Sequence, residues 1–79
     1  MGYYSLIAKK ENGHEITEND KRDFVADVIS IRLSESVRPD DPITARIVAE
    51  IGSRWDDLPM PVAAIDLPDL VENYFLKFS

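Results

Sequence analysis

The chain has 79 residues, and its 15 acidic against 9 basic side chains give a formal net charge of −6 at pH 7. This length allows a single domain with a limited hydrophobic core, so a second copy or a partner could complete it. The absence of cysteine excludes disulfide bonds, thiolate catalysis and cysteine-ligated zinc. The acidic charge argues against binding to duplex DNA, because such proteins neutralise phosphates with Lys and Arg.

Targeting signals are not recognisable in this sequence. The first ten residues, MGYYSLIAKK, carry neither a basic leader nor a long apolar run, so we expect no secretion signal. No apolar run approaches the roughly 20 residues that a membrane span needs. We therefore expect a cytoplasmic protein that does not enter a membrane.

The first predicted element is a β-hairpin. Side chains of Tyr3–Lys9 alternate between two faces, which predicts a strand. The pair Asn12-Gly13 follows, and Asn-Gly is a strong hairpin signal because a type I′ turn needs positive φ at both central residues. The second arm would be His14–Ile16. We expect this short hairpin to pack across the helices rather than to offer an edge strand to a partner.

The next segment, Asp20–Ser36, favours an amphipathic helix. Apolar side chains recur there at steps of four and three, from Phe24 to Ile31, which predicts one buried face. Thr17 precedes Asp20 by three residues, the spacing of a capping box in which each residue satisfies an amide of the other. The sequence therefore predicts a helix start just after Thr17.

An alternative ends this helix early and makes residues 28–34 a strand, because apolar and polar side chains also alternate there at period two. The segment ISIRLSES resembles the strand that opens a ribbon-helix-helix DNA-binding domain. The resemblance implies a dimer whose paired strands lie in the major groove, where Ser30, Arg32 and Ser34 would contact DNA. The family normally joins its helices by a short turn, whereas this chain has a long segment with prolines.

The clearest helical pattern covers Pro42–Trp55. Asp41 is a good N-cap, and Pro42 suits the first helical position. Trp55 continues a four-residue apolar repeat and is therefore expected in the core, although tryptophan is also a common interface anchor. Gly52 is unexpected inside this helix, so it indicates either the close approach of another element or an early end.

The last helix is predicted to begin at Asp66, as N-cap, with Pro68 in its first turn. The preceding residues 62–65 are too few to assign: they could form a turn of helix starting on Pro61 or a buried extended piece. Leu76 falls on the side of this helix opposite to its apolar face. Together with Tyr74 and Phe78, it suggests a surface for self-association or docking.

The side chains that could act as nucleophiles, acids, bases or metal ligands do not form a recognisable catalytic motif. His14 is the only histidine, and no nucleotide-binding, calcium-binding or triad spacing is present, so we expect no enzyme, no cofactor and no metal site. What remains is an acidic pair at each end of the Pro42–Trp55 helix. The predicted partner-binding residues are Asp40, Asp41, Trp55, Asp56 and Asp57.

The sequence therefore predicts one small domain over residues 1–79, of the α+β class but mostly α, with an N-terminal β-hairpin followed by three helices. Its predicted function is non-enzymatic protein binding, as an inhibitor, an accessory subunit or a phage- or plasmid-type host modulator. The expected partner is a protein with a basic surface, for example one that handles nucleic acids. The alternative is a dimeric ribbon-helix-helix regulator or antitoxin, and the first hypothesis also leaves room for a homodimer.

Overall fold

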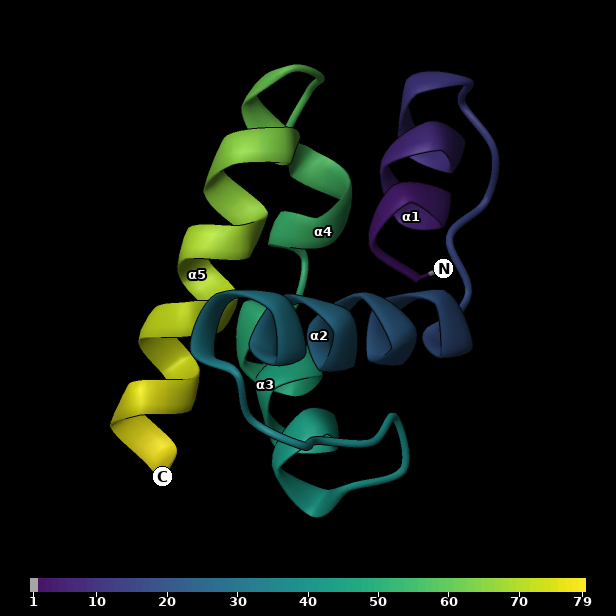
Figure 1. The fold of residues 1–79 in the computed structure, drawn as a ribbon. Helices are drawn as coiled ribbons and strands as arrows, with labels where there is room; N and C mark the ends of the chain where they lie inside the picture. The colour runs from purple at the N-terminus through teal and green to yellow at the C-terminus, as the bar shows by residue number, and fades with distance from the viewer. Residues whose placement is uncertain (1) are drawn as a thin grey trace.

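The computed structural model describes residues 2–79, and this part of the chain is helical without a strand (Figure 1). The helices are α1 (Gly2–Glu11), α2 (Glu18–Leu33), α3 (Pro42–Ile51), α4 (Arg54–Asp57) and α5 (Val62–Phe78). Helix α2 is central, because it contacts α1, α3 and α5. The α+β class predicted from the sequence is therefore wrong.

The predicted N-terminal β-hairpin is replaced by α1. Within residues 3–10 the buried or half-buried side chains recur at helical spacing, and Leu6 is fully buried between Tyr3 and Lys10 on one face. The Asn-Gly pair ends this helix instead of forming a hairpin turn. The amide of Gly13, at φ 73°, bonds to the Lys10 carbonyl, and the amide of His14 bonds to the Lys9 carbonyl at 2.8 Å. These are the two hydrogen bonds of a Schellman C-cap, which needs the same positive φ as the hairpin.

Helix α2 begins as the sequence predicts. The Thr17 hydroxyl accepts from the Asp20 amide at 3.2 Å, and the Asp20 carboxylate accepts from the Thr17 amide at 3.0 Å, which completes the capping box. The helix continues to Leu33 and stops at Ser34, whose φ of 54° is left-handed. Residues 28–33 are thus helical, and the alternative strand over 28–34 is wrong.

Helix α3 has the predicted N-terminus but ends earlier than expected. The Asp41 carboxylate accepts from the Ile43 amide at 3.0 Å, and Pro42 occupies the first turn. Gly52 has φ 58° and ψ −132°, a backbone conformation that essentially only glycine adopts, so the helix stops at Ile51. The chain then turns into the short helix α4, which carries Trp55.

Helix α5 begins at Val62, four residues before the predicted start, so Asp66 lies inside the helix rather than at its N-cap. The amide of Ala63 donates to the Pro59 carbonyl at 2.9 Å in the turn that leads into the helix. Ala63, Leu67 and Val71 are all buried at four-residue steps. This burial extends the apolar face by a turn and explains why the helix starts before the capping signal.

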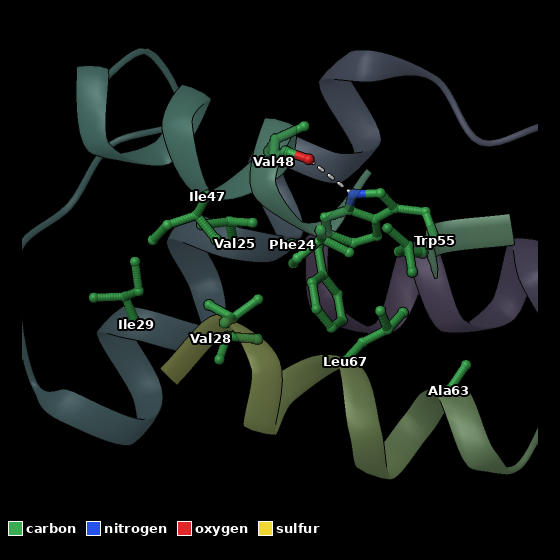
Figure 2. Close-up of a cluster of buried hydrophobic side chains, with 12 residues drawn as sticks. Phe24, Val25, Val28, Ile29, Ile47, Val48, Trp55, Ala63 and Leu67 are labelled. Atoms are coloured by element: carbon green, nitrogen blue, oxygen red, sulfur yellow. Dashed lines mark hydrogen bonds between the residues drawn. The ribbon is translucent and has the colours of Figure 1, made fainter. Parts of the chain in front are cut away.

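The core gathers around Trp55 (Figure 2). Its indole Nε1 donates to the Val48 carbonyl at 3.1 Å, and its ring meets Phe24 edge-on at a centroid distance of 5.8 Å. Phe24 also stacks on Tyr3 at 5.3 Å. Leu67 of α5 lies beneath these rings. The expectation that Trp55 belongs to the core is confirmed, and its ring links the short helix α4 to α2 and α3.

None of the helices among residues 2–79 combines the length and the apolar character needed to cross a membrane.

Candidate functional site

The first predicted acidic pair lies at the start of α3, and its two carboxylates have different local roles. Asp41 caps the helix through the Ile43 amide, so its carboxylate is already engaged. Asp40 Oδ1 lies 3.4 Å from Nε of Arg38, and both side chains of this ion pair are exposed. Such pairs contribute little to stability because water screens both charges. Asp41 thus has a capping role and Asp40 a solvated one, and partner binding by this pair stays a prediction.

The second acidic pair, Asp56 and Asp57, is exposed on α4, beyond the other end of α3. The ten residues of α3 separate the two pairs by about 15 Å, at roughly 1.5 Å of rise per residue. Trp55 lies between them in sequence but is fully buried, and Figure 2 shows its ring pointing into the core. The structure thus does not bring the five predicted partner-binding residues together on one surface.

The three residues proposed for DNA contact under the alternative lie on a helix or at its end. Ser30 and Arg32 belong to α2, and Ser34 is its C-cap residue. Arg32 Nη1 contacts Asp69 Oδ1 at 2.5 Å and Glu72 Oε2 at 3.1 Å, both on α5. The guanidinium is therefore held by carboxylates of the same chain.

A different surface is visible along α5. Its solvent-facing side carries Val62, Ile65, Asp69, Glu72 and Leu76, which follow one another at steps of three and four residues and so share one stripe. We call this stripe, with the neighbouring Asp66, the α5 outer face. Ile65 and Leu76 are 62% and 59% exposed, and Val62 is also exposed. The α5 outer face therefore has apolar ends and an acidic middle.

Arg32 connects this face to α2. Its hydrogen bond to Asp69, helped by the one to Glu72, raises the pKa of the guanidinium above its ordinary value. The carboxylates of Asp69 and Glu72 both contact Nη1 of Arg32, so these three side chains together carry a net charge of −1. Asp66 adds another negative charge, since the described chain gives it no ion pair. The α5 outer face with Arg32 thus carries −2.

Ile31, in the last turn of α2 and directly before Arg32 in the sequence, is 68% exposed. The sequence pattern placed Ile31 on the buried stripe of α2, and this assignment is wrong. Val62 and Ile65 were missed because the pattern left residues 62–65 open between a helical turn starting on Pro61 and an extended piece. A helix extended back to Val62 would have revealed a second apolar repeat opposite the core, ending at the Leu76 that the pattern did identify.

Residues 2–79 enclose no pocket and contain no group of three or more acidic or histidine side chains suited to a metal ion. The single histidine, His14, is exposed after the end of α1.

In comparisons with known proteins, no protein-family model, no curated protein and no solved structure matches this chain.

Proposed function

We propose that this chain is a non-enzymatic protein-binding module that contacts its partner through the α5 outer face and through Ile31, the exposed residue that precedes Arg32 on α2. The observation that supports this proposal is the alignment of exposed apolar side chains at Val62, Ile65 and Leu76 on one helical stripe. Isolated exposed leucines and isoleucines are common, but several on one face are typical of an interaction surface.

The physical argument concerns the free energy that this surface can release. Burying an aliphatic side chain fully contributes about 1.5–3 kcal/mol, so covering two side chains that are 62% and 59% exposed would contribute about 1–2 kcal/mol each. Two such residues at the ends of an acidic stripe would act as anchors, with the charges around them providing specificity. The module would act on its partner by occupying a surface, as an inhibitor or an accessory subunit does.

The net charge of −6 favours a partner with a basic surface. The free carboxylates of Asp56 and Asp57, which have no ion pair among residues 2–79, would add long-range attraction without belonging to the contact itself. Their effect would be strongest at low salt, because the Debye length falls from about 30 Å at 0.01 M to about 10 Å at 0.1 M.

The test is a comparison of variants in a capture experiment. The tagged chain is used to capture proteins from a nuclease-treated lysate of its source organism, alongside the double variant Ile65→Asp/Leu76→Asp. Tyr4→Ser is the matched control, since Tyr4 is 78% exposed on α1, away from α5. We expect one protein to be captured by the wild type and by the control but not by the double variant.

Folding must be checked in the same variants. Because Ile65 and Leu76 are exposed, their replacement should leave the helical circular dichroism spectrum intact and shift stability by about 0.5 kcal/mol or less each. Capture that is equal for all three proteins, with folding intact, would contradict the proposed surface.

A further inference from the structure

We infer that the partner segment that binds the α5 outer face is a basic amphipathic α-helix. This inference rests on the proposed function and adds the chemistry of the partner. It follows from the order of side chains along the stripe: apolar at Val62 and Ile65, acidic at Asp69 and Glu72, and apolar again at Leu76.

The acidic middle of the stripe has more negative than positive charges. Asp69 and Glu72 share one nitrogen of Arg32, and Asp66 has no ion pair in the described range, so this face carries three carboxylates and one neutralising guanidinium. A carboxylate accepts up to four hydrogen bonds, and each of these two uses one in the contact with Arg32. Lys or Arg side chains of a partner can therefore bind beside Arg32 without displacing it.

The spacing of the apolar side chains defines the shape of the partner. Ile65 and Leu76 are eleven residues apart, which corresponds to about 16 Å along a helix. A helix that lies along α5 would meet both with apolar residues about three turns apart. Its residues between these positions would face Asp69 and Glu72 and should be basic. This is the pattern of an amphipathic helix with a basic centre.

A second copy of this chain is disfavoured by the same charges. Asp69 lies midway along the stripe from Val62 to Leu76. If the α5 outer faces of two copies met, their acidic middles would therefore lie against each other, whether the two α5 helices ran parallel or antiparallel. The two faces would bring together six carboxylates and only two guanidinium groups. Like charges facing one another at an interface are repulsive and suppress such pairing.

The test is an unbiased selection. A display library of random 16-residue peptides is selected on the immobilised full chain, and enriched peptides are then measured against wild type, Ile65→Asp/Leu76→Asp and Tyr4→Ser. We expect enriched peptides with net positive charge and apolar residues ten to twelve positions apart. Their affinity should fall at least tenfold on the double variant and remain unchanged on Tyr4→Ser.

A second variant tests the charges separately. Asp66→Lys should lower the affinity of the enriched peptides at least threefold. Their affinity for the wild type should also fall as salt is raised. If the enriched peptides are neutral or acidic but do not bind the double variant, the inference of a basic helix is overturned while the proposed surface stands. Failure to enrich any peptide, or binding that the double variant does not change, would overturn both. A dimer that the double variant dissociates would identify a second copy as the occupant and contradict the inference.

Discussion

Replacing Trp55 by Phe should lower the free energy of unfolding by about 2–3 kcal/mol. The indole is fully buried, and its Nε1 donates to the Val48 carbonyl at 3.1 Å. The lost hydrogen bond accounts for about 1 kcal/mol. The Val48 carbonyl still accepts from the Gly52 amide at 3.3 Å, so the substitution leaves no buried acceptor without a partner.

The remaining loss comes from packing. Truncating a buried tryptophan to alanine costs about 3–5 kcal/mol, and phenylalanine keeps much of that volume, so the smaller ring should cost about 1–2 kcal/mol. A domain of 79 residues has a total stability of about 4–12 kcal/mol at typical values per residue. The variant should therefore fold, with a melting temperature lowered by about 10–20 °C.

The assay is urea unfolding followed by far-UV circular dichroism. Fluorescence would not compare the two proteins, because Trp55 is the only tryptophan. Tyr4→Phe is the control. Because the ring of Tyr4 is exposed, this substitution should change the free energy of unfolding by about 0.5 kcal/mol or less. A loss below about 0.5 kcal/mol for Trp55→Phe would refute the placement of the indole at the centre of the core.

Three further predictions concern the helix ends and the α2–α5 contact. Gly52→Ala should destabilise the protein by about 1–3 kcal/mol in urea unfolding, because alanine is strained at φ 58° and ψ −132°; an unchanged midpoint would contradict the early end of α3. The hydrogen bond from Lys9, and next the one from the Thr17 amide, lower the pKa of Asp20 below its ordinary value. Its stabilising contribution should thus be complete above about pH 5 and be lost as the pH falls through the folded-state pKa, so the stability difference between wild type and Asp20→Asn should shrink in acid. Arg32→Ala should cost only about 0.5–1 kcal/mol, and less in high salt, because its ion pairs are partly exposed; thermal unfolding at two salt concentrations measures this.

Local hydrogen-bonding signals were readable from the sequence. The capping box of Thr17 and Asp20 and the cap at Asp41 depend on residues two or three positions apart, so the pattern alone locates the starts of α2 and α3. Trp55 was expected in the core because it continues a four-residue apolar repeat, and it is buried although the helix implied by that repeat ends at Ile51.

Features that depend on tertiary packing were not readable in this way. Asn12-Gly13 supplies the positive φ that both a hairpin turn and a helix C-cap require, and the packing of Leu6 selects the helix. Asp66 resembles an N-cap, but the burial of Ala63 extends α5 past it. The α5 outer face was missed for the same reason, since Ile65 belongs to a helical stripe only when the helix begins at Val62.

The most direct test of the binding surface is a backbone-amide chemical-shift map of the labelled protein, titrated with the captured partner or a selected peptide. The account predicts the largest shifts along the α5 outer face and at Ile31, with saturation at one equivalent. Shifts centred instead on Asp40, Asp41, Asp56 and Asp57, with α5 undisturbed, would contradict the account and place binding on the acidic pairs at the ends of α3.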